Sequence, residues 1–175
     1  ISGSFLILAK KYLNEIALMG FENESNDDKA SANAAISGTA IKGQLSSSSD
    51  KDYYKITTSG AGTIAIAFDA PTSSSYNDYF KVALTDSSGT VLAAQDTGKD
   101  TTFSAGVGSS GSYYVYVEKD SFYDSGQYSL TATATTGSTS GTETEDNNSQ
   151  SKADTLTSGT AIKGQLSSSS DKDYY

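Results

Sequence analysis

Short segments in which apolar and polar residues alternate run through the middle of the chain. Ile64, Ile66 and Phe68 fall on one face of one such segment, and residues 113–117 alternate in the same way. A period of two is typical of a β-strand with one buried face. Turns rich in glycine and serine separate the segments. The pattern predicts about eight strands, at residues 39–46, 52–58, 62–69, 79–85, 90–95, 101–107, 112–118 and 126–134.

Short strands at this spacing, without a helix-length amphipathic segment between them, indicate an all-β fold. We expect an antiparallel β-sandwich. The first twenty residues differ, because apolar residues recur at helical spacing within residues 5–19, which predicts a short N-terminal helix. Lys10, Lys11 and Glu15 interrupt the apolar stretch, so a signal peptide fits poorly. We interpret the helix as the end of a preceding domain, and a helix on a membrane surface is the alternative.

An internal duplication sets the domain organisation. The segment Ser37–Tyr54 recurs unchanged at Ser158–Tyr175, and the same offset of 121 residues pairs Glu22 with Glu143. A repeat of this length matches a self-sufficient domain, so the chain is expected to be a piece of a tandem array. The alternative, one domain with a long loop, fits less well because the repeat restarts directly afterwards. The predicted parts are a helical remnant at 1–20, a sandwich at 21–136, a flexible linker at 137–142 and an incomplete second repeat at 143–175.

Composition excludes several classes of function. The 175 residues include no His and no Cys, which excludes zinc sites, thiol nucleophiles, imidazole bases and the usual serine triad. The net charge is −9 and every basic residue is Lys, so a nucleic acid is a poor partner. No apolar run is long enough to span a membrane. The chemistry that remains is the binding of hard cations by carboxylates, or surface recognition.

Two acidic motifs supply candidate metal ligands. ENESND begins at Glu22 and DKDYY begins at Asp50. Because alternate residues of an extended chain face the same side, each motif presents its acidic and amide side chains together. Calcium suits such a cluster better than magnesium, because it accepts six to eight oxygen ligands in flexible geometry. An acidic surface exposed to water is the alternative. The candidate ligands are Glu22, Glu24, Asn26, Asp27, Asp50 and Asp52.

The motifs, taken in order, resemble a known family. The order ExExND, GTAIKGQL from Gly38, DxDYYxI, and then GSYYVYV followed by GQYSLTATA is similar to the bacterial pre-peptidase C-terminal domain over Glu22–Ala134. This resemblance implies a jelly-roll-like β-sandwich appended to secreted bacterial enzymes, often peptidases, or present in surface proteins. The collagen-binding domains of clostridial collagenases are relatives, and their calcium site implies that the six candidate residues bind calcium.

Tyrosines are the second group of candidates. By strand parity Tyr54, Tyr113 and Tyr128 point into the core, and other tyrosines fall on the opposite face. Exposed tyrosines offer flat contact area for an extracellular polymer, either a protein or a polysaccharide. Ordinary strand-forming residues on a sheet surface are the alternative. The candidate ligand-binding residues are Tyr53, Tyr114, Tyr116 and Tyr123.

These features lead to one preferred function and one alternative. We expect a non-catalytic, calcium-stabilised accessory or binding module of a secreted or cell-surface bacterial protein. The alternative is a structural spacer repeat of a large adhesin or filament, which the duplication favours. An enzyme using paired carboxylates fits less well, because metal binding explains the same residues. The copied segment 158–175 is expected either to stay disordered or to insert into a neighbouring molecule as a swapped element.

Overall fold

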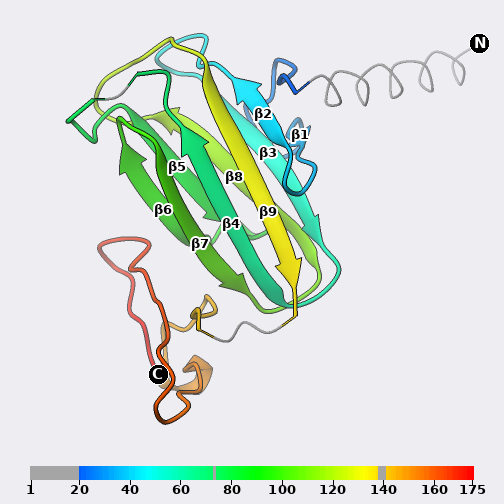
Figure 1. Cartoon of the computed structure of the whole chain (residues 1–175), viewed down its shortest axis with the longest axis vertical. Helices are drawn as coiled ribbons and strands as arrows, with labels where there is room; N and C mark the ends of the chain where they lie inside the picture. Colours follow the sequence, from blue (N-terminus) through cyan, green and yellow to red (C-terminus); the bar gives the residue numbers. More distant parts are fainter. Residues whose placement is uncertain (1–19, 73, 138–140) are drawn as a thin grey trace, which may run out of the picture.

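The computed structural model describes residues 20–72, 74–137 and 141–175, and its main body is a two-layered β-sandwich (Figure 1). One short 3₁₀ helix lies near the C-terminus at Gln150–Lys152. Within the described residues the strands, in chain order, are β1 (Asn33–Ala34), β2 (Ala40–Gly43), β3 (Lys51–Thr58), β4 (Gly62–Asp69), β5 (Phe80–Thr85), β6 (Val91–Thr97), β7 (Thr101–Val107), β8 (Gly111–Lys119) and β9 (Tyr128–Thr136).

The two layers are a five-stranded sheet in the order β1-β3-β8-β5-β6 and a four-stranded sheet in the order β2-β9-β4-β7. All pairings between these strands are antiparallel except that of β1 with β3, which is parallel. The predicted all-β antiparallel sandwich is confirmed, and each of the eight predicted strands has a counterpart. The additional strand, β1, is only two residues long and joins the edge of the larger sheet.

The core lies between the sheets and follows the predicted alternation. Ile64, Ile66 and Phe68 of β4 are fully buried, and so are the inward tyrosines Tyr54 and Tyr128. The Phe68 ring lies 5.2 Å from the Tyr128 ring between centroids. Large aromatic side chains therefore fill the end of the core where β3 and β9 face each other, and they carry hydroxyl groups there that need partners.

The two ends of the chain concern the predicted N-terminal helix and the predicted second repeat. The predicted N-terminal helix falls within residues 1–20, of which residues 1–19 lie outside the described part of the chain. Among the residues that are described, no helix has the length and apolar character needed to cross a membrane. Residues 141–175 lie beside the sandwich near β6 and β7, away from the edge where the chain enters β1 and β2 (Figure 1).

Candidate metal centre

An acidic strap, residues 20–28, crosses the edge of the sandwich before β1. The Glu22 amide donates to the Lys42 carbonyl at 2.9 Å, and the Lys42 amide donates to the Gly20 carbonyl at 2.7 Å, so the strap pairs with β2. Further along, the Tyr53 amide donates to the Asn26 carbonyl at 2.8 Å. The strap is therefore attached to β2 of one sheet and to β3 of the other.

The turn from β2 to β3 brings two more acidic side chains to the strap. Asp50 closes this turn, because one carboxylate oxygen accepts the Ser46 amide at 2.5 Å and the other accepts the Lys51 amide at 2.9 Å. Asp52 is the second residue of β3 and points inward, where its side chain is fully buried. An aspartate at this inward position places a carboxyl group at the end of the apolar core, beneath the strap.

The candidate ligands that the sequence singled out meet at this point. Carboxylate oxygens of Glu22, Glu24 and Asp52 lie within 4.8 Å of one another, and those of Glu24, Asp27 and Asp50 do so as well. Glu24 belongs to both groups and joins them. The sixth candidate, Asn26, is fully buried within the strap. Five carboxyl groups and one amide thus converge from the strap and from the start of β3.

Two oxygens and one nitrogen at the centre are buried without a partner among the described residues. Oδ1 of Asp52 and both polar atoms of the Asn26 side chain accept or donate no hydrogen bond among the described residues. A buried polar atom left unpaired costs on the order of 1–3 kcal/mol. Folded proteins rarely leave such atoms together unless a water molecule or an ion satisfies them. The donor set is all oxygen apart from the amide nitrogen, which is the chemistry that hard cations prefer.

Two buried tyrosines hold the carboxylates in place. The Tyr54 hydroxyl donates to Oε2 of Glu22 at 2.5 Å, the Tyr128 hydroxyl donates to Oδ2 of Asp52, and the two hydroxyls lie 2.7 Å apart. The other Glu22 oxygen accepts the Gln44 amide at 2.6 Å. Hydrogen bonds from residues that do not themselves bind the metal fix the orientation of metal ligands. The alternation of side chains along the strands correctly predicted that both tyrosines point into the core. Their hydrogen bonds to the acidic side chains were not predicted.

The surroundings of the centre raise the pKa of the Glu22, Glu24 and Asp52 carboxyl groups and lower that of Asp50. Burial, and next the nearby Glu22 carboxylate, raise the pKa of Asp52 to about 8 from its usual 3.8. Burial also raises the pKa of Glu22 and that of Glu24. Burial acts in the same direction on Asp50, but hydrogen bonds from Ser46 outweigh it and lower the pKa of Asp50 overall. The cluster therefore retains protons that a cation would displace.

We expect the cation-free protein to lose stability as the pH rises from about 4 to about 8. In this window Asp52 is ionised in the unfolded chain but still protonated in the folded one, so raising the pH favours unfolding. Glu22 and Glu24 act in the same direction. Urea unfolding with a chelator, compared between the native chain and Asp52→Asn, isolates the contribution of Asp52. A stability difference between the two proteins that stays constant with pH would contradict this assignment.

The second repeat contains a copy of the centre. Carboxylate oxygens of Glu143, Glu145 and Asp173 lie within 4.8 Å of one another, and Asn147 is fully buried with its Oδ1 unpaired among the described residues. The Tyr175 hydroxyl donates to Oε2 of Glu143 at 2.7 Å, as Tyr54 does to Glu22 in the first repeat. Burial raises the pKa of Glu145 to about 7. The short copied segment therefore adopts the same acidic arrangement without a complete sandwich around it.

Three of the four candidate tyrosines lie together on the outer face of the five-stranded sheet. Tyr53 and Tyr116 face each other across β3 and β8, with ring centroids 5.6 Å apart. The Lys51 amine lies 4.5 Å from the centre of the Tyr116 ring, and Tyr114 is on the same face of β8. We call Tyr53, Tyr114 and Tyr116 the tyrosine patch. Tyr123 is apart from it, in the loop before β9, where its hydroxyl donates to the Leu45 carbonyl at 2.9 Å.

Comparison with known proteins finds solved structures with a similar fold. No protein-family model matches the chain, and no curated protein matches it. The structure is similar to the crystal structure of the pre-peptidase C-terminal domain of the collagenase from Bacillus anthracis, with 25% sequence identity and a TM-score of 0.45. The match covers 63% of this chain and 99% of that one. That solved domain is of the family whose motif order the chain resembles.

Proposed function

We propose that this chain is a non-catalytic accessory or binding module of a secreted or cell-surface bacterial protein, and that calcium stabilises it. The observation that carries the calcium proposal is the pair of buried, unpartnered oxygens, on Asn26 and Asp52, among five carboxyl groups. The motif order shared with the pre-peptidase C-terminal domain supports the proposed setting. The module would work outside the cell, where calcium is abundant.

Calcium fits the centre better than other cations do. Its six to eight oxygen ligands can be supplied by carboxylates, an amide and carbonyls, whereas magnesium demands near-ideal octahedral geometry and keeps several waters. Transition metals prefer nitrogen and sulfur ligands, and the chain has no His and no Cys. The proposed ligands are Glu22, Glu24, Asn26, Asp27, Asp50 and Asp52. A bound cation would remove the repulsion among the carboxylates and fasten the strap to both sheets.

The tyrosine patch is the proposed contact surface for an extracellular polymer. The half-buried tyrosines supply amphipathic contact area at small entropic cost, and the Lys51 amine, which is paired with Glu118, lies over the rings of Tyr53 and Tyr116. A tyrosine hydroxyl is protonated at neutral pH, and burial raises the pKa of Tyr116 further, to about 12. Tyr123 is not included in this surface, because its hydroxyl donates to the Leu45 carbonyl in the connection from β2 to β3.

Binding to insoluble polymers tests the proposed role. We expect the chain to sediment with fibrillar collagen or with cellulose, and the double variant Tyr53→Ser, Tyr116→Ser to lose this binding by about tenfold or more, because central aromatic residues supply much of the free energy at interfaces. Tyr76→Ser is the matched control, since Tyr76 is 66% exposed on a loop outside the patch. Equal sedimentation of the double variant and the control would contradict a role for the patch. If neither polymer sediments the native chain, a binding role toward these polymers is contradicted.

A structural spacer repeat is the second candidate function. It is favoured by the unchanged recurrence of residues 37–54 at 158–175 and by the reproduction of the acidic arrangement in the second copy. In such a protein each repeat supplies length, and calcium at each strap stiffens it. A module that binds calcium but neither polymer would support this candidate over the first.

A further inference from the structure

The strap of the first repeat and that of the second contact the sandwich at opposite edges. The first strap pairs with β2, at one edge of the four-stranded sheet, through Phe21 and Lys42. The second strap, residues 141–149, lies at the other edge of the same sheet, where Thr144 pairs with Gly106 of β7. Figure 1 shows residues 141–175 at the β6 and β7 side of the sandwich, away from the first strap.

The second strap also pairs with its own repeat, as the first one does. The Glu143 amide donates to the Lys163 carbonyl at 2.9 Å, and the Lys163 amide donates to the Gly141 carbonyl at 3.0 Å. These bonds match those of Glu22 and Lys42 in the first repeat. At the same time, the Gly106 amide of β7 donates to the Glu143 carbonyl at 3.2 Å. One short segment thus bonds to both repeats.

The contact with β7 is close and involves a glycine. A Cβ atom at Gly106 would lie 2.2 Å from the Glu143 carbonyl oxygen, so a side chain at this position would displace the strap. Glu143 is only 4% exposed. A second bond joins the repeats on the neighbouring edge strand, because Nε2 of Gln165 donates to the Ala94 carbonyl of β6 at 2.5 Å. The second repeat therefore bonds to edge strands of both sheets.

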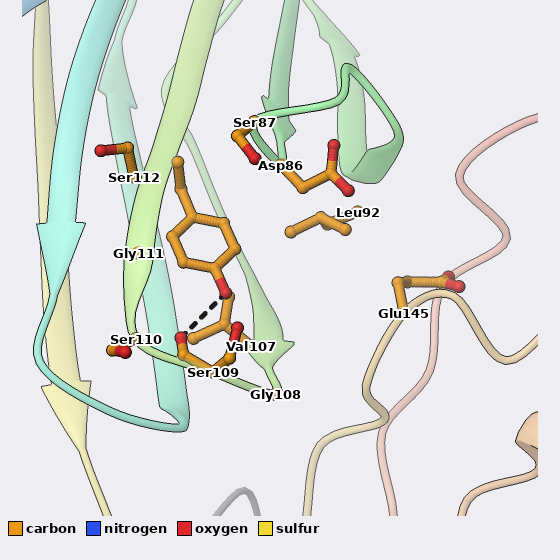
Figure 2. Close-up of a pocket in the computed structure, with 11 residues that line it drawn as sticks. Asp86, Ser87, Leu92, Val107, Gly108, Ser109, Ser110, Gly111, Ser112 and Glu145 are labelled. Atoms are coloured by element: carbon orange, nitrogen blue, oxygen red, sulfur yellow. Dashed lines mark hydrogen bonds between the residues drawn. The ribbon is translucent and has the colours of Figure 1, made fainter.

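The surroundings of the contact assign different roles to Glu143 and Glu145 of the second strap. A shallow pocket separates the strap from the end of the sandwich and is lined by Asp86, Leu92 and residues 107–112 on one side and by Glu145 on the other. Figure 2 shows the Glu145 carboxylate turned away from the sandwich residues and toward the C-terminal segment. Glu145 thus faces the acidic cluster of its own repeat. The contact between the second strap and β7 is made by the main chain at Glu143.

We propose that the strap is a shared strand between successive repeats, pairing with β2 of its own repeat and with the β7 edge of the repeat before it. The contact occupies the edge of β7 at Gly106, which would otherwise be open to pairing with other chains. Because the first strap and the following strap occupy opposite edges, the same contact can recur head to tail along an array. Successive repeats would then be joined in a fixed orientation by one main-chain hydrogen bond at the β7 edge and by the Gln165 bond to β6. The bonds are made by main-chain atoms and one glutamine, so the proposal does not depend on calcium.

Amide relaxation of the full 175-residue chain in solution tests the shared strand. In the native chain we expect the amides of Thr142 and Thr144 to have order parameters like those of β7, about 0.85. Gly106→Ala should release the strap and lower them to below about 0.6. Gly60→Ala is the matched control, because a Cβ atom at Gly60 meets nothing within 4 Å, and it should change neither value.

Gln165→Ala provides a second variant that cannot disturb the folding of the sandwich, since Gln165 belongs to the second repeat. We expect it to lower the order of its own segment while circular dichroism stays native. Low order parameters for Thr142 and Thr144 in the native chain would overturn the proposal, as would unchanged values in Gly106→Ala. A dimeric mass in light scattering that becomes monomeric in Gly106→Ala would also overturn it, because the contact would then join two molecules as a strand swap.

Discussion

Calcium is expected to raise the melting temperature of the native sandwich, and Asp52→Asn is expected to remove most of this increase. At a calcium concentration 100 times the dissociation constant, linkage stabilises the folded state by about 2.7 kcal/mol. For a domain of this size that corresponds to an increase on the order of 10 °C. Asp52 supplies a buried carboxyl group with one unpaired oxygen, and its replacement by a neutral amide should weaken binding by about 100-fold or more.

The chain offers a matched control for this variant. Asp173 is the counterpart of Asp52 in the second repeat, and its pKa is likewise raised by burial. Asp173→Asn makes the same chemical change but leaves the sandwich and its strap untouched, so its calcium-dependent increase in melting temperature should equal that of the native chain. The assignment of Asp52 fails if Asp52→Asn responds to calcium as fully as Asp173→Asn does.

Gly43→Ala is expected to destabilise the sandwich by about 2 kcal/mol and to weaken calcium binding at the same time. A Cβ atom at Gly43 would lie 2.4 Å from the hydroxyl oxygens of both Tyr54 and Tyr128. One methyl group would therefore push apart the two hydroxyls that hold Glu22 and Asp52. Urea unfolding with a chelator measures the first effect, and calorimetric titration with calcium measures the second.

Gly60→Ala again serves as the comparison, because the same methyl group enters open space there. It should leave both the free energy of unfolding and the calcium affinity within error of the native values. If Gly43→Ala behaves like Gly60→Ala in both measurements, the tyrosine pair does not support the centre. If it lowers stability alone, the tyrosines matter for packing and not for the orientation of the acidic side chains.

The strands were largely predictable from the sequence because their side chains alternate between core and solvent. The segment 62–69 was predicted at the bounds that β4 has, since Ile64, Ile66 and Phe68 are separated by small or polar residues. β1 could not be predicted, because Asn33 and Ala34 show no alternation. Its two residues pair with β3 only because the strap has already been fixed beside that strand.

The gathering of acidic side chains could also be predicted, but their individual environments could not. Period-two spacing placed Glu22, Glu24 and Asn26 on one side of the strap. In the structure the strap bends at Glu24, which is exposed, whereas Asn26 is fully buried and its carbonyl accepts the Tyr53 amide. Tyr54 was correctly predicted to face inward, and Asp52, two residues before it on β3, is buried on the same side.

The tyrosine pair lay beyond sequence reasoning. Tyr54 is on β3 of one sheet and Tyr128 is on β9 of the other, and 74 residues separate them. Their hydroxyls come together only because the two sheets pack face to face. A local sequence pattern does not predict the distance between these two hydroxyls. The same holds for Gly43, whose lack of a side chain matters only because both hydroxyls lie against it.

A crystal structure determined from crystals grown with calcium, with an anomalous difference map, tests the proposed centre most directly. We predict one anomalous peak between the strap and the start of β3, within bonding distance of Oδ1 of Asn26 and Oδ1 of Asp52. Ordered water bridging these two atoms in a crystal saturated with calcium, with no anomalous peak at the cluster, would contradict the account.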